Sequence, residues 1–322
     1  MVLALIWFAN WRSASLNVPQ TLNYDLKPGT PTQVVIRDLA EVIGAATDSE
    51  QNCFTLCFRL LIEWEGVGAR LRHGEYRLEQ GITPDQLLSK LVSGDVVTYL
   101  VRVPEGITTK ALLKTLNEQT FLVPLPSHVD PGNLTQELGL SMPFAEGIFL
   151  PDTYQVKRGD SVAGVLTRAH EAMVNEVSQA WAGRGNVEVL SEHELLILAS
   201  IIEKETGDPG DRGQISQVFH RRLALDMRLQ TDPTVIYALG DSFDGDIRRR
   251  DLRVDSPFNT YRVKGLPPTP IALPSKAAIH AAAQPAEGDF LYFVARGDGT
   301  SQFSRTLDEH NQAVRRYQLQ AQ

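Results

Sequence analysis

Hydrophobic spacing divides the first third of the chain into helical and extended segments. Apolar residues recur at helical spacing through residues 32–60, and again after two Gly-Ile-Thr triplets that begin at Gly81 and Gly106. In each triplet the threonine predicts an N-cap, and leucines at equal offsets predict one helical face. A strand candidate precedes each triplet, at residues 75–78 and 96–103. The pattern therefore predicts a small α+β module that contains two strand–helix units.

A nearly continuous apolar run predicts a buried helix at residues 192–206. Ser191 and Glu194 form a capping-box pattern, and Gly207 and Pro209 end the run. The helix is apolar almost all round, which predicts burial on most faces. Around it the spacing predicts helices at 161–181, 214–223 and 275–283, a hairpin about Gly297, and a last helix from residue 306. A short helix that ends near residue 240 is also predicted.

Three charged residues, Glu203, Lys204 and Glu205, close the buried helix. At about 100° per residue, the two glutamates point about 200° apart and cannot form a carboxylate pair with each other. Glu205 shares its stripe with Leu198 and Ile202. Burial and the negative end of the helix dipole both favour the protonated carboxyl, so we expect a raised pKa, as a general acid needs. The alternative is a solvated helix tip.

Composition excludes several functional classes. Among 322 residues, 31 are Lys or Arg and 39 are Asp or Glu, and the net charge of −8 excludes a non-specific nucleic-acid binder. Two cysteines exclude a disulfide framework and a Cys-rich zinc site. Cys53 and Cys57 lie on a predicted apolar stripe with Leu56, Leu60 and Leu61. A disulfide between them would be strained, and buried free thiols are favoured. We expect neither a metal nor a cofactor.

The N-terminal residues 2–9 form an unbroken apolar run. Eight residues are too few to cross a bilayer, which needs about 20. No basic residue precedes the run, so it is also a poor signal peptide. Either residues 1–12 are a loose hydrophobic end, or they are the remnant of a membrane anchor with Trp7 and Trp11 at the interface. Residues 13–31 are predicted to be a linker that leads into a first strand.

Several motifs, in order, resemble the YceG-like family of endolytic murein transglycosylases, from about residue 25 to the C-terminus. The motifs are residues 146–154, 199–206 (ASIIEKET), 228–237 (RLQTDPTVIY), 259–261 (NTY), 265–268 (GLPP), 292–294 and 310–311. The resemblance implies an α+β protein with a LysM-like module and adjoining strand–helix unit at 32–125 and a catalytic domain at 126–322. It also implies a single-pass inner-membrane protein with its bulk in the periplasm, anchored through residues 1–12.

The resemblance implies a reaction as well. It is cleavage of the β-1,4 bond between N-acetylmuramic acid and N-acetylglucosamine in nascent peptidoglycan strands, which leaves a 1,6-anhydromuramic end and terminates elongation. The family's catalytic glutamate directly precedes a threonine, which gives Glu205 here. Penicillin-binding synthases are implied as partners. The residues that we expect to assist are Gln230, Asn259 and Tyr261 at the sugar, with Glu203, Asp232 and Thr234 in support, Asp232 as the N-cap of the short helix.

Three alternatives compete with this interpretation. The first is a non-catalytic glycan-binding protein that uses the LysM-like module, with Glu205 purely structural. The second is a pyridoxal-phosphate lyase with Lys204 as its Schiff-base lysine, although no Gly-rich phosphate loop opens a nearby helix. The third is a hydrolase with Glu203 as its base.

Overall fold

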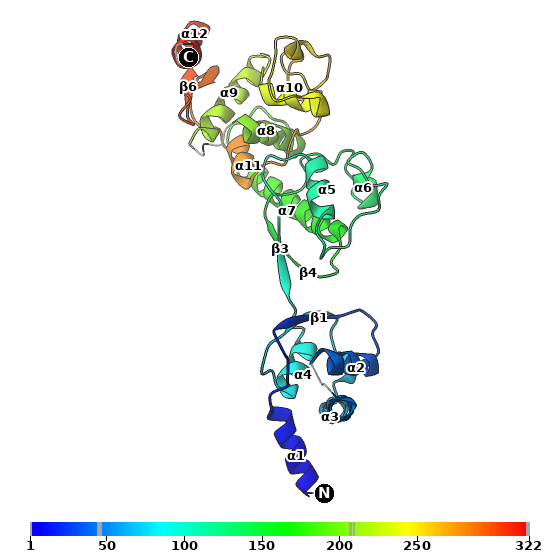
Figure 1. Cartoon of the computed structure of the whole chain (residues 1–322). Helices are drawn as coiled ribbons and strands as arrows, with labels where there is room; N and C mark the ends of the chain where they lie inside the picture. The colour runs from blue at the N-terminus through cyan, green and yellow to red at the C-terminus, as the bar shows by residue number, and fades with distance from the viewer. Residues whose placement is uncertain (1, 44–46, 206–207, 209, 320–322) are drawn as a thin grey trace. The chain divides into compact units, whose positions relative to one another are not determined.

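The computed structural model describes residues 2–43, 47–205, 208 and 210–319, and the chain forms two compact units (Figure 1). The first comprises Met1–Leu100, Phe121–Val123 and Gln155–Asp160. The second comprises Val101–Thr120, Pro124–Tyr154 and Ser161–Gln322. Both helices and strands are present, so the predicted α+β class is confirmed.

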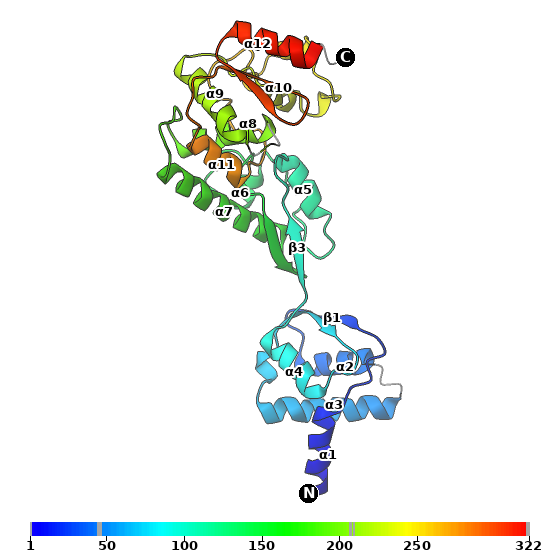
Figure 2. The same cartoon turned by 90° about the vertical axis from the view of Figure 1, so that its left-hand side faces the viewer.

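The first unit places four helices around a two-stranded sheet. Its elements are α1 (Val2–Ser13), β1 (Leu22–Leu26), α2 (Thr32–Val42), α3 (Asp48–Glu65), the 3-10 turn η1 (Gly68–Arg70), β2 (Gly74–Leu78) and α4 (Pro84–Ser93). β1 pairs with β2 in antiparallel register, with Tyr24 opposite Tyr76. Alternate residues of β1 face inward, as a half-buried strand requires. α2 packs on α3, and α4 contacts β2 and α1 (Figure 2).

The Gly-Ile-Thr repeat produces the two helix starts that it predicts. Thr83 forms a full capping box with Gln86, and Pro84 opens α4. Thr108 likewise caps α5 (Thr109–Asn117) by accepting the amide hydrogen of Ala111. The leucines of both helices are buried.

The prediction that one apolar stripe of α3 is buried is partly wrong. Cys57 and Leu61 are buried, but Leu56 and Leu60 are 60% and 46% exposed. A second stripe, which includes Phe54 and Phe58, packs in the core instead. Both cysteines are free thiols as expected, yet only Cys57 is buried.

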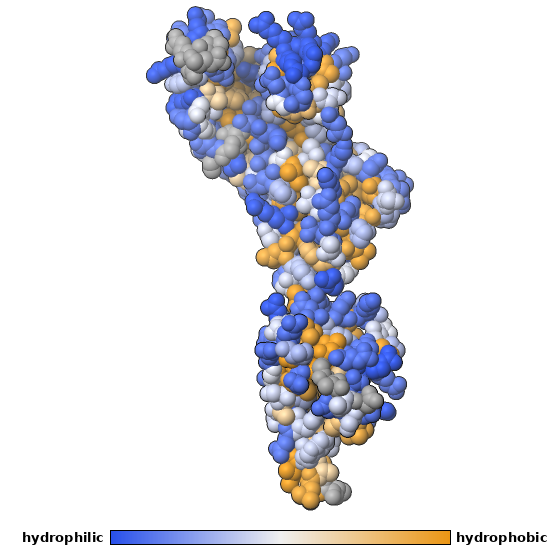
Figure 3. Space-filling view, viewed as in Figure 1, coloured by the Kyte–Doolittle hydropathy of each residue, from blue (hydrophilic) through white to orange (hydrophobic). Residues whose placement is uncertain are grey.

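The N-terminal helix α1 leaves most of its apolar side chains exposed, and Figure 3 shows hydrophobic surface gathered over it. Trp11 packs near Phe54, and Arg12 forms salt bridges with Glu65 and Asp85, so α1 is attached to the first unit. Within the described residues, no helix has the length and apolar character needed to cross a membrane.

The second unit is built around one buried helix, α8 (Glu192–Glu205). α8 contacts α7 (Val162–Ala182), α9 (Arg212–Ala224), α10 (Asp232–Leu239) and α11 (Lys276–Ala283). All residues from Leu195 to Ile202 are buried, which confirms the all-round apolar prediction. The Ser200 hydroxyl accepts the amide hydrogen of Ile271 at 3.0 Å and so ties α8 to the loop before α11.

Shorter elements complete the second unit. β3 (Thr98–Arg102) pairs with β4 (Thr153–Lys157), and residues of both strands are divided between the two units. β5 (Tyr292–Ala295) pairs with β6 (Ser301–Ser304) in the predicted hairpin, and Thr306 caps α12 (Leu307–Val314) with a capping box. The remaining elements are α6 (Leu134–Glu137), η2 (Gly240–Ser242), η3 (Asp251–Arg253) and the π-helix η4 (Arg315–Leu319).

Candidate active site

Glu205 lies at the C-terminal end of α8 and is partly buried. Its Oε1 atom accepts a short hydrogen bond from the Thr231 hydroxyl. Burial, with a smaller contribution from the Asp232 carboxylate, raises the pKa of Glu205 to about 7, while Thr231 and the Arg222 guanidinium pull it down. The pKa of this carboxyl is thus shifted in the direction expected for a glutamate at the end of a buried helix. A group with this pKa can both donate and accept a proton near neutral pH.

Two buried threonines, Thr234 and Thr260, hold Thr231 in place. The Thr231 amide donates to the Thr260 hydroxyl at 3.1 Å. The Thr234 hydroxyl donates to the Thr231 carbonyl at 2.7 Å and lies 2.8 Å from the Thr260 hydroxyl. All three residues are at most 2% exposed. The hydroxyl that contacts Glu205 is therefore carried on a rigid backbone, and Thr234 lies in its support.

The start of α10 differs from the prediction by one residue. Asp232 was expected as the N-cap, but Thr231 occupies that position and Asp232 is the first helical residue. Thr231 makes no side-chain cap bond, because its hydroxyl is directed to Glu205. Asp232 is exposed in the first turn, where the helix dipole favours a negative charge.

Asn259 is fully buried, and its side chain is bonded within its own loop. Its Nδ2 donates to the carbonyls of Leu252 and Val254 at 3.1 and 2.8 Å. Its Oδ1 accepts the amide hydrogen of Tyr261 at 3.0 Å. The side chain thus fixes the loop that presents Thr260 and Tyr261.

Gln230 and Tyr261 directly adjoin the threonine cluster in sequence, next to Thr231 and Thr260. Gln230 is exposed with a φ of 51°, and its amide donates to the Thr260 carbonyl at 3.2 Å. The Tyr261 hydroxyl donates to Asp232 Oδ1 at 2.6 Å, and burial raises the pKa of Tyr261. The loop at 259–261 and the residues before α10 are therefore brought together beside Glu205.

Glu203 and Lys204 have partners elsewhere. Glu203 Oε2 accepts from the Ser275 amide at 3.1 Å and from its hydroxyl at 2.5 Å. Ser275 is also the N-cap of α11, so Glu203 attaches the end of α8 to the start of α11. Lys204 is exposed and donates to the Gly106 carbonyl at 3.0 Å. The two glutamates are thus directed to different elements, as their helical spacing predicts.

Comparison with known proteins identifies the family of this chain. A model of the YceG-like family matches residues 24–316. The chain belongs to the YceG-like family. It is 32% identical over 279 residues to the endolytic murein transglycosylase of Bacillus subtilis (strain 168), a match that covers 81% of this chain and 76% of the relative.

Two further relatives agree. An endolytic murein transglycosylase of Streptococcus pneumoniae (serotype 2, strain D39) is 27% identical to this chain. The match covers 76% of this chain and 50% of that relative. A crystal structure of a YceG-like protein from Listeria monocytogenes has a TM-score of 0.54 and 28% identity, and the match covers 91% of this chain and 99% of the other. The structural match and the family match therefore indicate the same family.

In this YceG-like chain, sequence reasoning missed Arg222, which is only 8% exposed. Its Nε donates to the Leu291 carbonyl at 2.7 Å and its Nη1 to the Leu229 carbonyl at 2.6 Å. Its guanidinium lies over the Tyr292 ring, 5.2 Å from the centroid. One signal was available, because Arg222 falls four residues after Val218 on the apolar face of α9.

The partners of Glu205 come from two sides of the second unit. Thr231 lies at the start of α10, whereas Arg222 contacts Tyr292 of β5, whose ring stacks on His310 of α12 at 5.2 Å. Figure 3 shows this unit hollowed between the part that carries α10 and the part that carries β6 and α12. Thr231 therefore bonds the Glu205 carboxyl directly, and Arg222, which contacts β5, acts on it through its positive charge.

A second buried carboxyl of the YceG-like chain, Glu146, was also missed as an individual residue. Its Oε1 accepts from the Thr109 amide and hydroxyl at 2.8 and 3.1 Å, and its Oε2 accepts from the Tyr237 hydroxyl at 3.2 Å. Burial raises the pKa of Glu146. It thus joins the start of α5 to α10. The available signal was the motif at 146–154, which is too apolar for a linker and too irregular for a helix. It predicts a packed segment but does not identify a contact of Glu146.

Among the described residues, no group of three or more His, Cys, Asp or Glu side chains is arranged to hold a metal ion.

Proposed function

We propose that this chain is a lytic transglycosylase that cuts peptidoglycan glycan strands internally, with Glu205 as its acid–base residue. The observation that carries the proposal is a partly buried carboxyl with a pKa of about 7, bonded to Thr231 beside a polar loop. The names of the curated relatives support the same reaction class.

The reaction needs one carboxyl. Protonated Glu205 donates its proton to the oxygen of the β-1,4 bond between N-acetylmuramic acid and N-acetylglucosamine. The bond from that oxygen to C1 breaks, and its electron pair stays on the departing oxygen. The Glu205 carboxylate then takes the proton of the muramic C6 hydroxyl, whose oxygen bonds to C1. The product is a 1,6-anhydromuramic end, and no water is consumed.

The separate positions of the two glutamates support this mechanism. Inverting and retaining glycosidases use two carboxylates that flank the scissile bond, and a water molecule completes the reaction. Here Glu203 is bonded to Ser275, away from the partner of Glu205. An internal hydroxyl nucleophile removes the need for a second carboxylate.

Substrate contacts are proposed for the residues around Glu205. Tyr261 and the exposed Gln230 would bond sugar hydroxyls or acetamido groups, and the position of both next to the partners of Glu205 supports this role. Asn259 acts through the loop that it holds, and Thr234 through Thr231. Asp232 orients the Tyr261 hydroxyl.

Location and partners form part of the same proposal. Residues 32–125 would hold the strand as a LysM-like module with its adjoining strand–helix unit, ahead of a catalytic domain at 126–322. Residues 1–12 would belong to an inner-membrane anchor, with the bulk of the chain in the periplasm. There it would terminate elongating strands beside penicillin-binding synthases.

Mass spectrometry of digestion products tests the proposal. Purified chain should release anhydro-ended fragments from peptidoglycan, and Glu205→Gln should release none. Glu171→Gln, an exposed carboxyl of α7, is the matched control and should retain activity. Products heavier by one water would indicate hydrolysis, with Glu203 as a base. Binding to peptidoglycan without any cleavage by the wild type would indicate a non-catalytic glycan-binding protein.

A further inference from the structure

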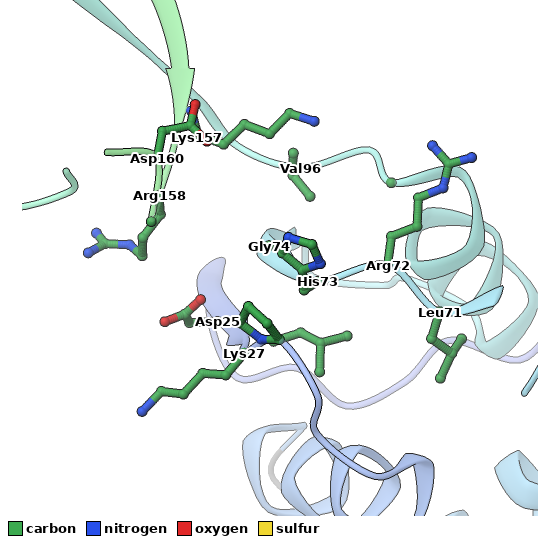
Figure 4. Close-up of a pocket in the computed structure, with 14 residues that line it drawn as sticks. Asp25, Lys27, Leu71, Arg72, His73, Gly74, Val96, Lys157, Arg158 and Asp160 are labelled. Carbon is green, nitrogen blue, oxygen red and sulfur yellow. The ribbon is translucent and has the colours of Figure 1, made fainter. Parts of the chain in front are cut away.

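The first unit contains a polar cleft of about 550 Å³, far in sequence from Glu205. Its walls come from the loop after β1, the segment that enters β2, residues 94–96, and the end of β4 (Figure 4). All of its lining residues belong to the first unit. The volume falls within the range of small-ligand sites, about 300–1,000 Å³.

Cationic side chains outnumber anionic ones in this cleft. Lys27, Arg72, Lys157 and Arg158 line it, against Asp25 and Asp160. Within the part of the chain that the structure describes, the first three of these cations form no salt bridge. Asp160 accepts the amide hydrogen of Lys157 at 2.9 Å, so it also orders the β4 wall. This net positive charge stands out in a chain whose total charge is −8.

The backbone of Arg72 is fixed on the cleft wall. Its carbonyl accepts from the Tyr76 hydroxyl at 2.6 Å, and its amide donates to the Leu91 carbonyl at 2.9 Å. Gly94 lies beneath its side chain, since a Cβ on Gly94 would come within 2.7 Å of Arg72 Cδ. The glycine therefore leaves the space that the arginine stem occupies.

Arg158 is held on the opposite wall by its own partners. Its Nε donates to Glu75 Oε2 at 2.9 Å, and its Nη2 donates to the Tyr99 hydroxyl at 3.2 Å. The Tyr99 ring stacks on Phe121 with centroids 4.3 Å apart. Figure 4 shows Lys157, Arg158 and Asp160 at the end of β4, across from the segment that carries Arg72 and His73, with the Arg158 side chain directed away from that segment. The backbone of Arg72 and the side chain of Arg158 are thus held by partners within the first unit.

We propose that this cleft binds the carboxylates of the peptide stems that peptidoglycan strands carry. The inference rests on the proposed function, because it assumes that the strand is the substrate. The sugars of a stem-bearing strand are uncharged, and its carboxylates lie on the stem. Lysine and arginine side chains recognise such groups by charge-assisted hydrogen bonds. The cleft would select stem-bearing strands, while Glu205 acts on the sugar bond.

Binding measured in an inactive background tests this separately from catalysis. The probe is a disaccharide-tetrapeptide of peptidoglycan, compared with the same molecule after every carboxyl is converted to an amide. The protein is the full chain carrying Glu205→Gln. Combining Lys27→Ala, Arg72→Ala and Lys157→Ala should weaken binding of the carboxylate form about tenfold at low salt and leave the amide form unchanged.

The matched control removes three exposed arginines of the same unit that do not line the cleft: Arg37→Ala, Arg70→Ala and Arg77→Ala. Unchanged binding by this control supports the site, and an equal loss would show a non-specific charge effect and overturn it. Equal affinity of the wild-type cleft for both probes would also overturn it. The proposal would also be wrong if the cleft variant lost binding to anionic phospholipid vesicles but still bound the peptidoglycan probe. The cleft variant that keeps Glu205 is then assayed for activity. If it continues to release anhydro ends, the proposed function stands although the cleft proposal fails.

Discussion

The Thr231 hydroxyl donates a hydrogen bond to the Glu205 carboxylate across 26 residues of sequence. This bond favours the charged form of a carboxyl that burial drives toward the neutral form. The pKa of about 7 is the balance of these opposing effects. A general acid that must later act as a base benefits from this balance, because neither protonation state is far from neutral pH.

Replacing Thr231 by valine should move the basic limb of the activity–pH profile to higher pH. The limb reflects loss of the acid form of Glu205, and removal of the donor raises the pKa of that carboxyl further. A hydrogen bond to a charged group contributes about 1.5–3 kcal/mol, so we expect a shift of roughly one pH unit or more. The measurement is kcat/KM for release of anhydro ends between pH 5 and 9.

Thr231→Ser keeps the hydroxyl and should retain the wild-type limb. Thr167→Val is a control for the isosteric change, because the Thr167 hydroxyl bonds to the Ala163 carbonyl within α7. An unshifted limb in Thr231→Val would show that Thr231 does not set the protonation of Glu205.

Glu205→Gln should stabilise the protein at alkaline pH and not at acid pH. The folded-state pKa of about 7 lies above the ordinary value of 4.5, so the folded state binds this proton more tightly than the unfolded state. That contribution is fully present below about pH 4.5 and is lost as pH rises through 7. At pH 8 the charged wild type should be less stable than the glutamine variant by about 3 kcal/mol, and at pH 4 by less than about 0.5 kcal/mol.

Urea unfolding at pH 4 and pH 8 measures the difference. Glu171→Gln provides the control for loss of a carboxyl at the surface. A stability gain that is equal at the two pH values would contradict the linkage to Glu205.

The parts of the site that follow from local pattern were predictable. The Ser191 cap and the apolar run set the start and the burial of α8, and helical rotation separated Glu203 from Glu205. The predicted helix end at Thr206 and Gly207 lies outside the described residues. The role of Thr231 was not predictable, because its partner lies on another helix and its position also suits an N-cap. On α3 two apolar stripes coexist, and spacing alone does not tell which of them faces the core. Tertiary packing decides both cases.

Arg222 should serve two separable purposes, one electrostatic and one structural. Arg222→Gln removes the positive charge that lowers the pKa of Glu205, so the basic limb of activity should move upward. It also removes donors from the carbonyls of Leu229 and Leu291, which should cost about 1–3 kcal/mol of stability. Arg222→Lys keeps the charge but not the fork of donors, so we expect lower stability with an almost normal pH limb.

Thermal unfolding and activity–pH profiles of both variants distinguish the two effects. The neighbouring Arg221 is exposed, and Arg221→Gln is the control. If the lysine variant shows the same limb shift as the glutamine variant, the charge of Arg222 is not what Glu205 senses.

Tyr261 and Asp232 should act on substrate binding as a coupled pair. The hydroxyl of Tyr261 donates to Asp232 Oδ1 at 2.6 Å, so each side chain orients the other next to Glu205. Tyr261→Phe and Asp232→Asn should each raise KM several-fold, because the bond orients sugar-binding groups. At a pH below the pKa of Glu205, which Asp232→Asn lowers by removing a negative charge, kcat should change little. The double variant should be less impaired than the product of the two single effects, with a coupling of about 1 kcal/mol. Steady-state kinetics on a defined glycan oligomer give the cycle. Additive effects would mean that the two side chains contact the substrate independently, and a fall in kcat alone would place them in the chemical step instead.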